Sequence, residues 1–166
     1  MSKEIYMKLE LHKKWIDTLG KEGIKLVLDE IDLRNVNLNN KELCEAYLLE
    51  CNFDNTKLEN VDFYVAVLCS STFKNSKLNK CDFYKANLDY TDFSGAVIRE
   101  VRFCKSDCFE AVFRNVSFYD CNFINAFFYL SDFSNAELNN IDVSGAAFDE
   151  TILKGATMKN IIGIEE

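Results

Sequence analysis

The chain carries an apolar residue at every fifth position from Leu33 to Met158, over 26 consecutive positions and without an insertion or a deletion. A second column lies two residues before each of these positions. It contains almost only Ala, Cys, Ser, Thr and Val, and Lys41 is its one charged member. An internal repeat decides the architecture of a whole chain, so the period of five constrains every element in this region.

Neither regular element accommodates this period. Five residues of an α-helix rotate by about 500°, which spreads the apolar column around the cylinder. In a continuous strand five is an odd number, so successive apolar residues would alternate between the two faces. The pattern is satisfied if three residues are extended, with the small and the large residue pointing inward, and the next two turn a corner. Repeated corners of one hand wind a solenoid whose coils stack at about 4.8 Å.

The phenylalanines indicate how many corners make one coil. Phe recurs in every second pentapeptide from Phe53 to Phe133. A coil with an even number of sides places Phe over Phe, whereas a three-sided coil would place Phe over Leu. Since aromatic rings pack well in offset columns, we expect four sides, and thus four pentapeptides, per coil. Each side then continues in every fourth pentapeptide and is named after its first central residue: the Leu33, Leu38, Leu43 and Leu48 sides.

A motif of a small residue, Asp or Asn, Leu or Phe and two further residues recurs along this region, as in Ala86–Tyr90 and Thr91–Gly95. It resembles the repeat of the pentapeptide-repeat proteins, and the resemblance covers roughly residues 31–160. The leader, His-Lys-Lys-Trp at His12–Trp15 followed by Gly20 and Gly23, is similar to one common in that family. The resemblance implies an all-β solenoid, a right-handed quadrilateral β-helix of pentapeptide repeats, with an N-terminal capping α-helix.

Three segments are expected: an N-terminal helix and cap over residues 1–27, a β-helix of about 6.5 coils over residues 28–160, and a C-terminal tail over residues 161–166. A helix is predicted over residues 3–19, stopping near Gly20. Its apolar stripe, together with Trp15, would cover the first coil, since an open coil exposes core and strand edges. The stripe consists of Ile5, Leu9, His12, Ile16 and Leu19.

Two further features concern the ends of the solenoid. Lys41 interrupts the small column in the first coil, so either the wall is distorted there or the stem of the side chain lies along the cap with its ammonium in water. At the other end, Ile161, Ile162 and Ile164 either cover the last coil or contact a second copy of the chain.

The corner residues predict two kinds of turn. Pentapeptides of the Leu33 side end in Asn or Gly, as at Asn55 and Gly95, and these residues tolerate the positive φ of a type II turn. Pentapeptides of the Leu48 side end in residues such as Glu50, Tyr90 and Leu130, which resist positive φ. We therefore expect type II corners on the Leu33 side and another type on the Leu48 side.

Charge is distributed unevenly over the four sides. The net charge of the chain is −8. The Leu48 side has no Lys or Arg and carries −6, the tail acids Glu165 and Glu166 supply the rest, and the other sides are nearly neutral. The same side exposes a group of aromatic residues in adjacent coils. Clustered aromatics mark interfaces, although outward acids and single rings also occur on ordinary surfaces. The predicted partner-binding face consists of Glu50, Asp89, Tyr90, Asp107, Phe109, Glu110, Phe127, Tyr129, Leu130, Asp149 and Glu150.

Composition excludes several classes of protein. The N-terminus has no secretory signal, no apolar run approaches the roughly 18 residues that span a bilayer, and the acidic charge opposes direct nucleic-acid binding. An odd number of cysteines without a Cys-x-x-Cys pair indicates a reduced, cytoplasmic location. Of these, Cys51, Cys81, Cys108 and Cys121 point inward and behave as small hydrophobes, whereas Cys44, Cys69 and Cys104 lie at corners and should react with alkylating agents.

No catalytic residue, metal site or cofactor is predicted. The single histidine, His12, has no partner motif and is assigned to the cap. The sequence contains no nucleophile–base pair, phosphate-binding loop or basic groove. The leading hypothesis is therefore a non-enzymatic interaction module that presents a rigid wall to a protein partner or to a second copy of itself.

The resemblance implies an alternative function. Pentapeptide-repeat proteins of the Qnr and MfpA type resemble duplex DNA in size and charge, bind DNA gyrase or topoisomerase IV and confer quinolone resistance. This chain shares an acidic repeat rod roughly 30 Å long. It departs from that type in having no loop inserted between repeats and no C-terminal dimerisation helix, and in the confinement of its charge to one face.

Overall fold

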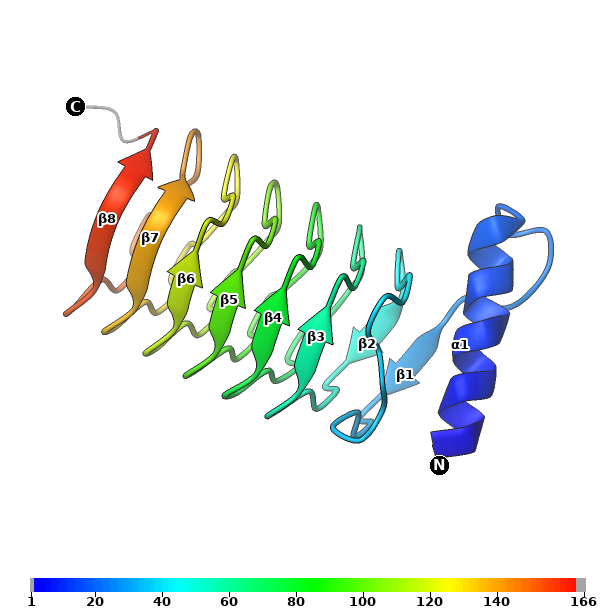
Figure 1. Cartoon of the computed structure of the whole chain (residues 1–166). Coiled ribbons are helices and arrows are strands. Elements are labelled where there is room, and N and C mark those ends of the chain that lie inside the picture. Colours follow the sequence, from blue (N-terminus) through cyan, green and yellow to red (C-terminus); the bar gives the residue numbers. More distant parts are fainter. Residues whose placement is uncertain (1, 164–166) are drawn as a thin grey trace.

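The computed structural model describes residues 2–163, as one N-terminal helix followed by a solenoid of short parallel strands (Figure 1). The strands β3–β8 lie side by side along one wall, and α1 lies across the first coils at the opposite end from β8. The elements are α1 (Ser2–Asp17), β1 (Val27–Asp29), β2 (Tyr47–Leu49), β3 (Lys57–Glu59), β4 (Lys77–Asn79), β5 (Val97–Arg99), β6 (Ser117–Tyr119), β7 (Glu137–Asp142) and β8 (Thr157–Ile162).

Each strand from β1 to β7 pairs in parallel with the segment four pentapeptides further along, which confirms the four-sided coil. Leu58 of β3 lies opposite Leu78 of β4 on the Leu38 side, and Leu28 of β1 lies opposite Leu48 of β2 on the Leu48 side. Isolated bridges continue the same register on the remaining walls, so parallel pairing closes all four sides. Between Val27 and Ile162 the chain completes about seven coils.

The interior is filled by the two predicted columns. Phe53 stacks on Phe73 with ring centroids 4.4 Å apart and the rings 2° from parallel. Phe63, from the facing side, meets Phe73 edge-on at 6.3 Å and 90°. Like residues thus stack along each wall and meet edge-to-face across the core, both of which are favourable ring geometries. Leu88 and Cys108 are also completely buried.

The corners differ from the expectation. Positive φ occurs on the Leu33 side, as at Asn55 (59°), but also on the Leu48 side at Tyr90 (59°) and Leu130 (58°). On both sides the carbonyl before the corner accepts a hydrogen bond from the N–H three residues later, which together with the positive φ defines a type II turn. The prediction of another turn type on the Leu48 side was therefore wrong. On the Leu38 side, β3 continues to Glu59 and the chain bends at Asn60, which also has a positive φ (52°).

The helix α1 covers the first coil, as predicted, through Ile5, Leu9 and His12, all of which are buried. The His12 Nδ1 accepts a hydrogen bond of 3.0 Å from the backbone N–H of Leu26, which ties the helix to the first coil. The helix ends at Asp17 rather than at residue 19. Leu19 has a left-handed backbone and is 90% exposed, so its assignment to the buried stripe was wrong.

Lys41 lies along the cap, which is the second of the two arrangements considered for it. Its Nζ lies 3.3 Å from a carboxylate oxygen of Glu10 on α1. Lys41 thus connects the first coil to the helix through an exposed ion pair, which contributes little to stability.

At the far end, β8 places two of the tail isoleucines within the last coil. Ile161 pairs with Ile141, and Ile162 pairs with Asp142 of β7. Ile164, Glu165 and Glu166 lie outside the described residues.

The cysteines are reduced, and most are buried. Burial raises the pKa of Cys81 to about 11 and that of Cys121 to about 12, so neither thiol ionises near neutral pH. Cys44 and Cys69 are half-buried at their corners. Cys104 is buried, with its Sγ 2.9 Å from the Asn122 Oδ1, so the prediction that it is accessible was wrong.

Two features are absent from residues 2–163. In this range no helix has the length and hydropathy needed to cross a bilayer. The same residues contain no group of three or more His, Cys, Asp or Glu side chains placed to hold a metal ion.

Candidate interaction face

The Leu48 side presents three outward columns of side chains. The middle column lies on the wall itself, where Asp107 is paired in register with Phe127. The two corner columns follow the inward central residue. One contains Asp89, Phe109, Tyr129 and Asp149, and the other contains Glu50, Tyr90, Glu110, Leu130 and Glu150. Because each column repeats once per coil, side chains from successive coils lie next to one another along the wall.

Three rings form a continuous chain on this wall. The rings of Tyr90 and Phe109 meet edge-to-face with centroids 5.4 Å apart, and Phe109 stacks with Tyr129 at 5.9 Å. The hydroxyl of Tyr129 then donates a hydrogen bond of 3.1 Å to a carboxylate oxygen of Glu150. Tyr90 is 52% exposed and Phe109 is half-buried between its neighbours. The structure therefore brings these four predicted residues together across four coils.

Phe127 stands beside this chain of rings on the flat part of the wall. It is 57% exposed, more than any other phenylalanine, although the inward Phe128 next to it is completely buried. The corner residue Leu130 is also exposed, between Glu110 and Glu150 of the adjacent coils. Removal of these apolar groups from water is favourable, so a partner that covers them would be stabilised on this surface.

Asp89 and Asp107 form the acidic centre of the face. The Asp89 Oδ1 accepts a hydrogen bond of 3.0 Å from the backbone N–H of Phe109, which fixes the carboxylate against the wall. Partial burial raises the pKa of the Asp107 carboxyl, and the neighbouring Asp89 raises it further. Two carboxylates held this close repel each other, so a cation that approaches them is attracted.

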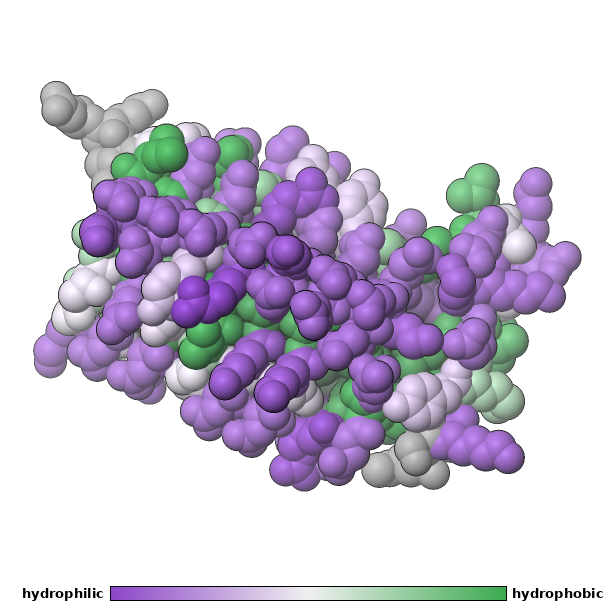
Figure 2. Space-filling model, in the orientation of Figure 1, coloured by the Kyte–Doolittle hydropathy of each residue, from purple (hydrophilic) through white to green (hydrophobic). Residues whose placement is uncertain are grey.

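Negative charge on this wall has no balancing base. Each ion pair among residues 3–163 involves a base from another side or from the cap, such as Arg102 with Asp82 and Arg114 with Asp132. The wall that carries β3–β8, by contrast, is mixed in charge and largely hydrophilic (Figure 2). The residues of the Leu48 side thus carry negative charge without a base of their own, although Lys25 lies over the ring of Tyr47 at 5.0 Å in its first coils.

Glu50 and Asp149 lie away from the centre of the face. Glu50 belongs to the coil of β2, two coils and thus roughly 10 Å from Tyr90. Asp149 is exposed at the opposite end, in the coil before β8. The eleven predicted residues consequently form a strip along the wall, with its apolar part in the coils of Tyr90 to Tyr129.

Sequence reasoning missed a second aromatic cluster, on the Leu43 side. Tyr64 and Tyr84 stack with centroids 5.6 Å apart, and Arg102 lies over the Tyr84 ring at 4.8 Å. Lys85 and Lys105 approach the same ring at 5.7 and 5.8 Å. The recurrence of Tyr at the same place in successive coils was the signal that could have revealed it. This cluster already contains its own cations, so it differs from the uncompensated Leu48 side.

Comparison with known proteins defines the class to which the chain belongs. A family model described as pentapeptide repeats matches residues 27–63, 66–103, 98–135 and 128–162, in eight copies. This match covers most of the chain, and the chain belongs to the pentapeptide-repeat family. The sequence matches no curated protein at a significant level.

Several solved structures are similar to this chain, and the first of them supports the fold. Rfr23, a pentapeptide repeat protein from the cyanobacterium Cyanothece, is similar with a TM-score of 0.55 and 17% identity, over 83% of this chain and 91% of that one. HetL, a pentapeptide repeat protein involved in heterocyst differentiation regulation in the cyanobacterium Nostoc, gives 0.43 and 16%, over 80% and 85%. QnrB1, a plasmid-mediated fluoroquinolone resistance protein, gives 0.34 and 15%, over 82% and 92%.

Proposed function

We propose that the protein is a non-enzymatic interaction module that binds a protein partner through its Leu48 side. The observation that carries this proposal is the chain of exposed rings from Tyr90 through Phe109 to Tyr129 on a wall without a single base. Hot spots of interfaces are enriched in aromatic residues, which supports this use of the face.

The chemistry of the face indicates what kind of partner it fits. A basic surface would place Lys or Arg side chains against Asp89 and Asp107, where charge complementarity speeds association and selects the partner. The exposed faces of Tyr90 and Tyr129 offer cation–π contacts to the same side chains. The partner we infer is therefore a protein with a basic, shallow surface that can follow a flat wall.

Rigidity supports the same proposal. Parallel hydrogen bonds join each coil to the next on all four sides, so the rings are held in fixed positions before binding. A preorganised face loses less conformational entropy on association than a loop does. A partner of matching shape would therefore bind without rearrangement of the wall.

A second candidate function is binding of DNA gyrase or topoisomerase IV as a mimic of DNA, with quinolone resistance as its consequence. The observation that favours it is the net charge of −8 on a rod of repeats. The confinement of that charge to one wall favours the first candidate, because duplex DNA carries its phosphates on both strands around the axis. We also infer a cytoplasmic location, supported by seven reduced cysteines.

Affinity capture with matched variants tests the proposed face. Phe127→Glu with Tyr129→Glu should abolish capture of a partner, while the melting temperature changes little because both side chains are exposed. Tyr64→Glu with Tyr84→Glu is the control, since it adds the same charge to another wall. Equal binding by the two double variants would refute the proposed face, and a large loss of stability in the first would show that its rings support the fold.

A supercoiling assay separates the two candidates. If the protein mimics DNA, it inhibits gyrase supercoiling, and reversal of charge at Asp107 and Glu110 should relieve that inhibition. Absence of inhibition at tens of micromolar protein would contradict the second candidate and leave the first in place.

A further inference from the structure

The rings of the Leu48 side are spaced along the wall by nearly one turn of an α-helix. The centroids of Tyr90 and Phe109 lie 5.4 Å apart, and those of Phe109 and Tyr129 lie 5.9 Å apart. Successive coils stack at about 4.8 Å, and an α-helix rises by about 5.4 Å per turn. A helix that runs along the solenoid can therefore place one side chain of each turn over each coil.

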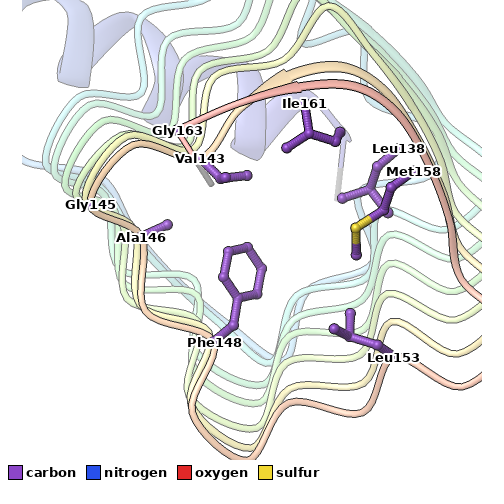
Figure 3. A pocket seen from close by; sticks show the side chains of 9 residues that line it. All are labelled: Leu138, Val143, Gly145, Ala146, Phe148, Leu153, Met158, Ile161 and Gly163. Atoms are coloured by element: carbon purple, nitrogen blue, oxygen red, sulfur yellow. The ribbon is translucent and has the colours of Figure 1, made fainter. Parts of the chain in front are cut away.

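The wall is straight enough for a helix to follow. Its flat column is paired in register through five coils, from Val67 to Ala147. Figure 3 looks into the last coil and shows the earlier coils following the same outline, with Phe148 directed inward from this side. A straight rod laid along the wall thus stays over the same columns.

Other backbone conformations do not keep this step. An extended strand presents every second side chain to one face, about 6.6 Å apart, so it falls out of phase with the coils by about 2 Å at each step. A polyproline II segment repeats after about 9.3 Å and contacts alternate coils only. For a helix the mismatch is about 0.6 Å per turn. Over the three steps from Tyr90 to Glu150 it reaches about 2 Å, which long side chains can absorb.

Apolar groups of this wall form a strip on which a helix can rest. The strip begins with Tyr90 and the half-buried Phe109 in two successive coils. The next coil adds the exposed side chains of Phe127, Tyr129 and Leu130. Leu, Ile or Met side chains on one face of a helix would cover these groups and remove them from water.

Carboxylates held in place border this strip. Asp89 accepts a hydrogen bond of 3.0 Å from the backbone N–H of Phe109, and Glu150 accepts one of 3.1 Å from the Tyr129 hydroxyl. Glu110 is exposed in a coil between these two acids. A Lys or Arg on the helix can lay its apolar stem over a ring and bring its cationic head to one of these carboxylates. Charge therefore selects a basic helix.

Two lysines indicate where on the wall the helix lies. Lys85 and Lys105 lie at the corner that precedes the flat column, and they approach the Tyr84 ring at 5.7 and 5.8 Å. They repel a basic helix, whereas the opposite corner of the wall carries Glu110 and Glu150. The helix is therefore placed nearer the acidic corner, over the rings.

We propose that the element bound by the Leu48 side is a basic amphipathic α-helix of the partner, lying along the solenoid axis. Its apolar stripe covers the rings from Tyr90 to Tyr129, and its Lys or Arg residues face Asp89, Glu110 and Glu150. This inference rests on the proposed function of that wall. Three steps between coils span about 14 Å, which corresponds to about ten helical residues. A contact this small belongs to the weak, transient class.

Synthetic peptides of about 14 residues, made of Leu, Ala and Lys, test the helix by fluorescence anisotropy with the full chain. In the first peptide, Leu recurs at helical spacing on one face, with Lys on both flanks. The second has the same composition in scrambled order, and the third is the first with Pro at its centre. The first should bind with a dissociation constant of tens of micromolar. The other two should bind at least tenfold more weakly, because neither presents one continuous apolar stripe. Equal binding of the scrambled or the Pro peptide, or no binding of the first, would overturn the inferred helix.

Matched substitutions locate the helix on the wall. Glu110→Gln with Glu150→Gln should weaken binding of the first peptide about tenfold. Glu59→Gln with Glu100→Gln, at exposed positions of the Leu38 side, is the control with the same change of net charge and should have little effect. Lys105→Gln should tighten binding, because it removes a repulsive charge. An equal effect of the two double variants, or unchanged or weaker binding by Lys105→Gln, would overturn the placement.

Failure of the helix and failure of the proposed function give different results. If the first peptide does not bind although Phe127→Glu with Tyr129→Glu abolishes capture of a partner, the wall is an interface and its partner element is not a helix. If that double variant captures the partner as the wild type does, the proposed function itself is wrong, and the inferred helix falls with it.

Discussion

Replacement of one stacked ring, Phe93→Leu, isolates what the aromatic columns contribute to stability. The Phe93 ring is completely buried and stacks on Phe73 at 4.8 Å and on Phe113 at 5.2 Å. It also meets Phe83 and Phe103 edge-on, both at 6.1 Å. Leucine keeps most of the apolar volume but removes all four ring contacts.

The expected loss follows from these four contacts. Each ring pair contributes about 0.5–1.5 kcal/mol beyond the area it buries, and neighbouring contributions do not add fully. We therefore expect Phe93→Leu to lower the free energy of unfolding by about 2–3 kcal/mol. Phe148, in the last coil, is the matched control. It is only partly buried and has two ring neighbours, Phe128 at 5.0 Å and Phe133 at 6.1 Å, so Phe148→Leu should cost about 1 kcal/mol.

Urea denaturation followed by far-ultraviolet circular dichroism measures both variants. With a slope of about 2 kcal/mol per molar urea, Phe93→Leu should move the midpoint by about 1 M or more. Equal midpoints for Phe93→Leu and Phe148→Leu would contradict this reasoning, because Phe93 exceeds Phe148 both in burial and in ring contacts. A midpoint of Phe93→Leu equal to that of the wild type would refute the reasoning entirely.

Two further predictions concern the cap and the corners. Burial lowers the pKa of His12 in the folded chain, so the unfolded chain is protonated at a higher pH than the folded one. The contribution of His12 to the free energy of unfolding should therefore be complete above about pH 6.5. Below that pH it should fall by at most about 1.4 kcal/mol per pH unit. Thermal melts between pH 7.5 and 5 should show this slope in the wild type and a flatter one in His12→Gln; parallel slopes would contradict it. Glu50 has a φ of 50°, a left-handed backbone that is costly for any residue with a Cβ. Glu50→Gly should therefore raise the free energy of unfolding by about 0.5–1 kcal/mol, as measured by denaturant titration. A lower free energy of unfolding would show instead that the carboxylate makes a structural contact.

The period of five was sufficient to predict the solenoid because each coil builds its own core from the same two columns. A residue such as Leu58 contacts Leu78 at the same place in the next coil, so a local pattern specifies a long-range contact. The acidic and aromatic wall could be assigned to one side for the same reason, since sides are defined by position in the repeat alone.

Local preferences failed where closure of the coil overrides them. Tyr90 and Leu130 resist positive φ, yet both adopt it, because a four-sided coil closes only if the chain makes a quarter turn within two residues. Cys104 was expected in solvent from its corner position, but it turns toward Asn122 and becomes buried. Leu19 matched the helical spacing, although the helix had already ended at Asp17. Propensities of single residues are worth about 1 kcal/mol, less than the packing and strand pairing of a whole coil.

The sequence by itself determined the number of sides, the register between coils and which side chains face outward on each wall, because all three follow from a strict repeat. Only the tertiary structure decided how those outward groups meet. It places Tyr90, Phe109 and Tyr129 in ring contact, brings Asp89 close to Asp107, and leaves Leu153 and Met158 exposed at the end of the last coil. Such contacts depend on side-chain direction and on what lies above the last coil, and neither is encoded in the period.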